Sequence, residues 1–148
     1  MITEDIVEIN APAQLVWQIF SDVERWPEWT ESVTSLVARD GTGLAVGKRF
    51  AIKQPGMSRL VWKVTEIDPG SSWTWVQRSP GVLVSARHWI TPQPDGRTLV
   101  RQQLDQRGLL GALVGRLMIK KTKRFLEQEA RGLKARSEQL GRADGSHS

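Results

Sequence analysis

The chain has 148 residues, 39% hydrophobic and 25% charged, with a formal net charge of +5 and no cysteine. This size and balance are typical of one globular domain, and the lack of cysteine excludes a disulfide scaffold, a thiolate zinc site and a cysteine nucleophile. Only two histidines are present, His147 being close to the C-terminus, so we expect no metal centre, and no motif indicates a cofactor. There is no apolar run long enough to span a membrane and no signal-peptide pattern, which favours the cytoplasm.

The basic charge belongs to one segment. Residues 116–142 carry nine Lys and Arg and three Glu, a net of +6, whereas residues 1–115 carry twelve basic and twelve acidic residues. The chain also has seven Trp, three Phe and no Tyr, an unusually heavy load of indole rings.

The first predicted elements are a strand and two short helices. Residues 2–9 alternate in polarity as a strand does. Asn10-Ala11-Pro12 marks a helix start, because proline suits the first turn. One apolar helix face then follows, made of Leu15, Val16, Ile19, Phe20 and Val23. Ser21-Asp22 is a second cap candidate, and Pro27 interrupts or ends the short helix that it begins.

Six strands are predicted next. They cover about residues 32–39, 48–54, 58–68, 72–79, 82–92 and 97–107. Short Gly, Pro and Asp turn signals separate most neighbouring segments, which indicates consecutive antiparallel hairpins.

Residues 109–140 predict one long amphipathic helix. Its uncharged stripe is Ile119, Thr122, Leu126, Ala130, Leu133, Ser137 and Leu140. All eleven charged residues from Arg116 to Glu138 lie off this stripe, so we expect them to face water. We expect one domain over residues 1–141 and a disordered tail over residues 142–148.

This order predicts an α+β fold in two layers. A curved, seven-stranded antiparallel sheet wraps around the long C-terminal helix, and two short helices lie between the first two strands. A helix that crosses a curled sheet need not fill the space beneath it.

Several fragments resemble a known family. APAQLVWQIFSDVERWPEW, VGKRF, VTEIDPG and PDGRTLVRQQLDQRG, followed by a long helix, are similar in kind and order to polyketide cyclase/dehydrase-like proteins of the START-like (SRPBCC) superfamily. The resemblance covers about residues 2–140. It implies the helix-grip fold and a ligand cavity between sheet and helix, but no single reaction, because fold does not give function.

Strand parity predicts the face that borders such a cavity. If paired residue numbers sum to 190 around the turn at Pro94-Asp95-Gly96, His88 faces Gln102 within an otherwise mostly apolar set. The opposite face then carries Arg87, Trp89, Leu99, Arg101, Gln103 and Asp105. His88 is either a ligand-binding or proton-transferring group or a buried histidine satisfied by Gln102 or a carbonyl. Glu66 could share its face, but its Glu-Ile-Asp-Pro context indicates a strand end.

Alternation also groups the aromatic residues. Trp62 and Val64 are predicted to face inward, Trp73, Trp75 and Gln77 share one face, and in the family the short helix before Trp29 closes one mouth of the cavity. These tryptophans either form an aromatic box for a flat apolar ligand or fill the core. The candidate ligand-binding residues are Trp29, Phe50, Trp62, Trp75, His88, Gln102, Met118 and Phe125.

The basic helix face has three interpretations. Its members are Lys120, Lys121, Lys123, Arg124, Arg131, Lys134 and Arg136. It is a solvated surface, a nucleic-acid patch, or a site for a membrane surface or an acidic partner. We expect no specific nucleic-acid binding, because no aromatic side chain is interleaved to stack a base.

Two functions from different classes remain. The first is a protein that carries, sequesters or senses a small hydrophobic, ring-containing ligand. The second is a cyclase or dehydratase acting on a polyketide-like or aromatic substrate, with His88 as proton shuttle and Gln102 beside it. A protein-interaction module that uses the basic helix face is a third, lesser alternative. The sequence fits a monomer or a homodimer and leaves the ligand open.

Overall fold

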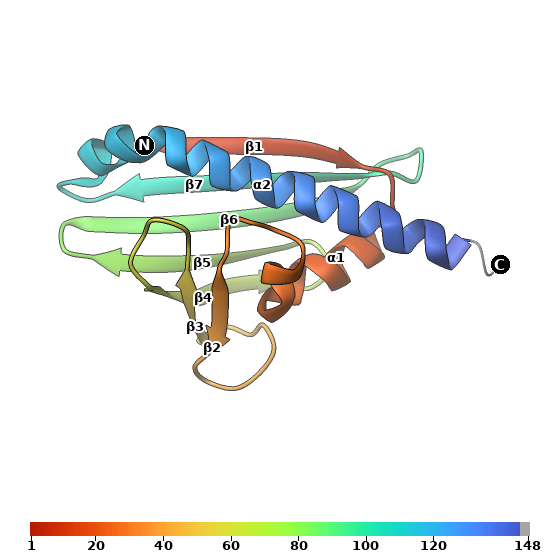
Figure 1. Cartoon of the computed structure of the whole chain (residues 1–148), viewed down its shortest axis with the longest axis horizontal. Helices are drawn as coiled ribbons and strands as arrows, with labels where there is room; N and C mark the ends of the chain where they lie inside the picture. The colour runs from red at the N-terminus through yellow and green to blue at the C-terminus, as the bar shows by residue number, and fades with distance from the viewer. Residues whose placement is uncertain (146–148) are drawn as a thin grey trace.

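The computed structural model describes residues 1–145 of the chain (Figure 1). Its elements, in chain order, are β1 (Ile2–Ile9), α1 (Ala13–Ser21), the 3-10 helix η1 (Val23–Glu28), β2 (Ser35–Ala38), β3 (Arg49–Lys53), β4 (Leu60–Asp68), β5 (Ser72–Ser79), β6 (Val82–Pro92), β7 (Thr98–Arg107) and α2 (Gly111–Gly145). This is the predicted order, and the architecture is the helix-grip fold. Pro12 immediately precedes α1 and Pro27 lies inside η1, as expected, although neither helix has a side-chain cap.

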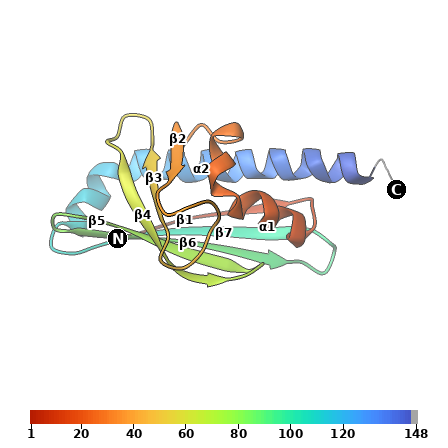
Figure 2. The same cartoon turned by 90° about the horizontal axis from the view of Figure 1, so that it is seen from below.

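The sheet has seven antiparallel strands in the order β1-β7-β6-β5-β4-β3-β2. Each strand from β2 to β6 pairs with the next along the chain, and β1 pairs with β7 at the edge of the sheet. Because these pairings are hairpins, turn chemistry in the sequence is enough to predict them. The helix α2 runs along one side of the sheet, and α1 lies on that same side (Figure 2).

The predicted register between β6 and β7 is confirmed. His88 pairs with Gln102, and every other pair of these strands also sums to 190. One residue of the expected solvent face differs. Asp105 is buried, and its carboxylate forms two ion pairs. Asp105 Oδ1 lies 3.8 Å from the Met1 amino group, and Oδ2 lies 2.6 Å from Arg107 Nε. The edge strand β1 thus covers a position that alternation alone assigns to water.

Helix α2 begins where the β5–β6 hairpin touches the end of β7. Gly108 has a φ of 100°, and a Cβ on it would stand 2.5 Å from the Gly81 carbonyl oxygen. Leu110 N donates to the same carbonyl at 2.9 Å. Only glycine allows this close approach, which sets where the long helix starts relative to the sheet.

The long helix differs from its prediction in three ways. It runs to Gly145, so residues 142–145 are helical rather than part of a disordered tail; residues 146–148, with His147, lie outside the described residues. Leu140, assigned to the buried stripe, is exposed. Glu129, assigned to the solvent face, is buried. The central stripe is otherwise confirmed, with Leu126, Ala130, Leu133 and Ser137 all buried.

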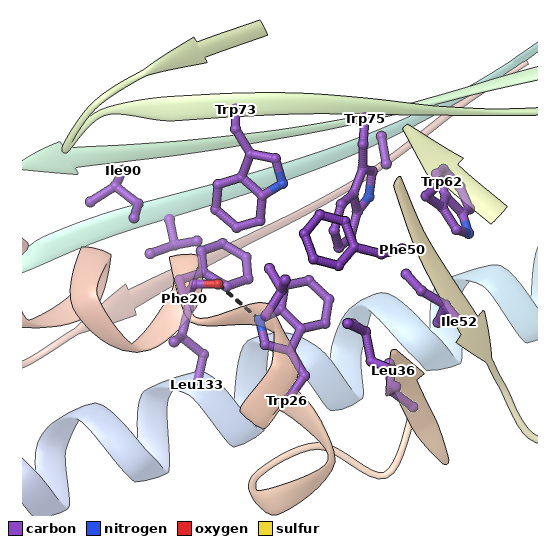
Figure 3. Packing of buried hydrophobic residues seen from close by; sticks show 14 of the residues in the cluster. Phe20, Trp26, Leu36, Phe50, Ile52, Trp62, Trp73, Trp75, Ile90 and Leu133 are labelled. Carbon is purple, nitrogen blue, oxygen red and sulfur yellow. Dashed lines mark hydrogen bonds between the residues drawn. The ribbon is translucent and has the colours of Figure 1, made fainter. Parts of the chain in front are cut away.

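The core contains a dense group of aromatic rings between the sheet, α1 and η1 (Figure 3). Phe20 stacks on Trp26, with ring centroids 5.4 Å apart, and meets Trp73 edge-on at 4.8 Å. Trp26 Nε1 donates to the Phe20 carbonyl at 2.8 Å, which satisfies the one polar atom of that indole. This packing closes one end of the space between sheet and helix.

Candidate functional site

The concave face of the sheet and α2 enclose a cavity of about 420 Å³. Most of its lining is apolar. Six of the eight candidate residues from the sequence line it, namely Trp62, Trp75, His88, Gln102, Met118 and Phe125. The sequence reasoning did not single out Trp26 as a candidate or place Glu129 beside the cavity, and both are also in the lining.

Trp29 and Phe50 are not among the lining residues. Phe50 is fully buried and packs against Trp75, with ring centroids 6.0 Å apart (Figure 3). Trp29 packs beside Trp26 at 5.5 Å, and its backbone and ring lie against Gly132 of α2. Both rings are therefore part of the packing around the cavity, and Trp29 does not stand at its mouth.

The cavity is elongated and its two ends differ. Helix α2 lines it from Val114 to Glu129, a length of about 22 Å at the helical rise. At the Val114 end the lining residues Pro80, Val82 and Met118 are partly or fully exposed. At the Glu129 end the lining residues are buried. The cavity is therefore open near the β5–β6 hairpin and closed beside η1.

His88 lies towards the closed end and is 3% exposed. Its ring stacks on Trp73, with centroids 4.0 Å apart, and Nδ1 is 3.1 Å from the Trp73 carbonyl oxygen. Because a carbonyl only accepts, Nδ1 carries the proton and Nε2 keeps its lone pair. Burial lowers the pKa of His88 to about 3, so the ring is neutral at pH 7.

Gln102 is opposed to His88 but is not its hydrogen-bond partner. Gln102 Nε2 donates to the carbonyl of Leu126 on α2 at 3.4 Å. The side chain is 2% exposed, and its Oε1 is buried with no hydrogen-bond partner among the described residues. A buried oxygen that lacks a donor is costly, and this one belongs to a residue that lines the cavity.

Glu129 faces the cavity from α2 and is 7% exposed. Ser32 Oγ donates to its Oε1 at 3.1 Å, and Thr30 Oγ1 lies 2.9 Å from Ser32 Oγ. None of the ion pairs within residues 1–145 involves it. Burial raises the pKa of Glu129 to about 8, with a further upward contribution from the charge of Asp5 and a downward one from Ser32.

The position of Glu129 beside the cavity could have been predicted from a second helix face, next to the stripe of uncharged residues. Met118, Thr122, Phe125 and Glu129 step by four, three and four, so they share a helix face. That face lies beside the stripe and lines the cavity. Glu66, the other carboxylate considered, is exposed on β4 and is not in the lining.

Metal ligands and membrane-spanning helices are two further possibilities within residues 1–145. No group of three or more His, Cys, Asp or Glu side chains comes together there that could hold a metal ion. No helix of those residues is both long and apolar enough to cross a membrane.

The seven-stranded sheet and the long helix across it define a protein of the helix-grip fold. Residues 2–138 match the model of the family described as polyketide cyclase/dehydrase and lipid transport, and the chain belongs to that family. None of the curated proteins matches the chain.

Solved structures share the fold at low sequence identity. A START superfamily protein from Mycobacterium smegmatis is 23% identical, with a TM-score of 0.69 over 94% of this chain and 98% of that one. The Zhui aromatase/cyclase from Streptomyces sp. R1128 is 19% identical, with a TM-score of 0.76 over 98% of both chains. The XoxI protein from Bacillus cereus is 14% identical, with a TM-score of 0.76 over 94% and 96%.

Proposed function

We propose that this protein binds a small, largely apolar, ring-containing ligand in the cavity between the sheet and α2, as a carrier, a reservoir or a sensor. The observation that carries the proposal is a cavity of about 420 Å³ with Trp26, Trp62, Trp75 and Phe125 in its lining. Aromatic walls with a few placed polar groups are typical of small-molecule sites, and this volume suits a ligand of two or three rings.

The state of His88 favours binding over proton-transfer chemistry. A general base works best when its pKa lies near the operating pH. The pKa of His88 is about 3 because the ring is buried, and its Nδ1 is already engaged by the Trp73 carbonyl. His88 can therefore accept a hydrogen bond at Nε2 but is a weak base at pH 7. A cyclase or dehydratase that uses His88 as proton shuttle receives less support from this geometry.

The proposal is tested by filling the cavity. Ala86 lies on the inner face of β6 and lines the cavity, whereas Ser85 precedes it on the opposite face. The probe is 1-naphthalenemethanol, followed by calorimetry and by tryptophan fluorescence. We expect the unaltered protein to bind it and Ala86→Leu to weaken binding at least tenfold, while the control Ser85→Leu binds as before.

Thermal melts of both variants show whether each is folded. A folded protein that binds neither the naphthyl probe nor decanol, a ring-free apolar probe, would refute the proposal. Binding of decanol but not of the naphthyl probe would retain the cavity and reject a ring-containing ligand.

A further inference from the structure

The closed end of the cavity brings three polar side chains together from three elements. His88 on β6 and Gln102 on β7 are direct partners in the sheet, and Gln102 reaches the carbonyl of Leu126 on α2. Glu129 follows Leu126 by one helical turn and lines the same cavity. Trp26 and Trp75 lie around this group, with ring centroids 6.1 and 5.7 Å from that of His88.

The free hydrogen-bonding capacity of these groups consists mainly of acceptors. Gln102 Oε1 has no hydrogen-bond partner within residues 1–145, and His88 Nε2 keeps its lone pair because Nδ1 donates to the Trp73 carbonyl. Glu129 receives one hydrogen bond, from Ser32. The free acceptors are therefore Gln102 Oε1, His88 Nε2 and, once its proton has left, the carboxylate of Glu129, so a complementary ligand brings donors.

Within the described part of the chain, the closed end of the cavity also has no cationic side chain that could pair with a carboxylate. The one Lys or Arg residue in the cavity lining is Arg87. Its side chain is exposed and it alternates with His88 along β6, so it belongs to the other face of the sheet. The charged group that acts on Glu129 is the carboxylate of Asp5 on β1, itself beside Glu127 and Arg131. His88 lines the same cavity and is neutral. None of them neutralises a negative charge on Glu129 directly.

We propose that Glu129 is the recognition residue of the cavity and that it binds the protonated amino group of an apolar ring-containing ligand, with Gln102 accepting a second hydrogen bond from that group. An ammonium group supplies both hydrogen-bond donors for the free acceptors and a positive charge for the carboxylate of Glu129. A hydroxyl supplies one donor but no charge that could pair with the carboxylate form of Glu129. The rings of Trp26 and Trp75 add attraction for a cation, and the hydroxyls of Ser32 and Thr30 hold Glu129 in place.

Binding of an amine in this way releases the carboxyl proton of Glu129. In the empty protein burial keeps Glu129 mostly protonated at pH 6, because its pKa is raised to about 8. The ammonium enters with its own charge, so the carboxyl proton leaves to the buffer and a carboxylate–ammonium pair forms. Close to one proton is therefore released for each amine bound at pH 6, and the apparent affinity for the amine rises between pH 6 and pH 8.

The inference rests on the proposed function, and three probes with one ring system test it. They are 1-naphthalenemethylamine, 1-naphthalenemethanol and 1-naphthoic acid, titrated by calorimetry in two buffers of different ionisation enthalpy. We expect affinity in the order amine, alcohol, acid. We expect proton release with the amine alone, and we expect Glu129→Gln to weaken amine binding roughly 10- to 100-fold, the scale of a hydrogen bond to a charged group. The alcohol should change by less than about threefold.

The control variant is Gln139→Glu, which adds a carboxyl at an exposed position of the same helix, outside the lining residues. It should leave the preference for the amine unchanged. Equal binding of amine and alcohol, tightest binding of the acid, or an unchanged amine affinity in a folded Glu129→Gln variant would overturn the assignment of Glu129 and leave the proposed function standing. Failure of all three probes to bind would overturn both.

Discussion

The Cα of Gly132 lies directly against the backbone carbonyl of Trp29, so that a Cβ at position 132 would stand 2.0 Å from the carbonyl oxygen. This contact joins α2 to the segment that follows η1, at the closed end of the cavity. On helix propensity alone, Gly132→Ala should stabilise the protein by about 1 kcal/mol. We expect the opposite, because the backbone at Trp29 or in α2 must move to make room for the methyl group. The free energy of unfolding should fall by about 1–3 kcal/mol, as at other overpacked sites. Denaturant unfolding measures the change.

Gly141 in the same helix is the matched control. A Cβ there would meet Leu15 at 3.6 Å and Ala11 at 3.7 Å, which are ordinary contacts. Gly141→Ala should therefore stabilise the protein by roughly 0.5–1 kcal/mol. Gains of similar size from both substitutions would show that α2 does not pack against Trp29 this closely.

A second prediction concerns the pH dependence contributed by Glu129. Its pKa is raised from 4.5 to about 8 in the folded protein, so the folded state holds a proton that the unfolded state releases. Its stabilising contribution is fully present below pH 4.5 and is lost as the pH rises through 8. The slope is at most about 1.4 kcal/mol per pH unit for one proton. We expect Glu129→Gln to gain stability relative to the unaltered protein between pH 5 and pH 8, in parallel denaturant titrations. A constant difference between the two proteins over that range would show that Glu129 is ionised in the fold.

His88 contributes with the opposite sign. Its pKa is lowered from 6.5 to about 3, so its contribution is present above pH 6.5 and is lost as the pH falls through the folded value. In His88→Gln this dependence disappears, and the stability difference between the unaltered protein and the variant should shrink from pH 6.5 towards pH 4. The variant also loses the stack on Trp73, which shifts the difference at every pH but not its slope. A difference that widens on acidification would contradict a buried neutral ring.

The sequence predicts the sheet well because its information is local. Turn signals delimit the hairpins, and a single parity argument at Pro94-Asp95-Gly96 places His88 opposite Gln102, as observed. The same reasoning places both on the concave side, which they share with the cavity. The register of a strand pair follows from the turn between its strands, and alternation then assigns every side chain to a face.

What the sequence does not predict depends on contacts between distant segments. Glu129 looks like one charge among eleven on a basic helix, and only the approach of Ser32 and of the sheet shows that it is buried. Asp105 is covered by the N-terminus from 104 residues away in the chain. Phe50 has the inward alternation of a cavity residue, yet it packs against Trp75 and is not in the cavity lining. Such burial depends on how the helices pack on the sheet. The periodicity of residues within one helix or strand does not predict that packing.

A fourth prediction concerns the basic face of α2. Lys120, Lys123, Arg124 and Arg131 are exposed, while Arg136 pairs with Glu28 at 2.9 Å and Lys134 with Glu138 at 2.7 Å. Phe125, the aromatic residue within this stretch of the helix, is buried and lines the cavity. It cannot stack a base on the basic face, so we expect weak binding to nucleic acid that disappears at moderate salt. Gel-shift assays with two unrelated duplexes at increasing salt would measure it. A preference for one duplex that survives moderate salt and is lost in K120E/K123E/R124E would overturn this expectation.

The tryptophans provide the last prediction, because the structure separates those that line the cavity from those that do not. Trp62 and Trp75 line it, and Trp29 does not. Energy transfer and quenching fall steeply with distance, so a bound naphthyl probe should quench mainly the indoles that it touches. We expect Trp62→Phe and Trp75→Phe each to reduce the quenching amplitude and to change affinity severalfold, whereas Trp29→Phe keeps both. If Trp29→Phe alone removed the quenching, the ligand would lie between η1 and α2 rather than in the cavity between sheet and helix.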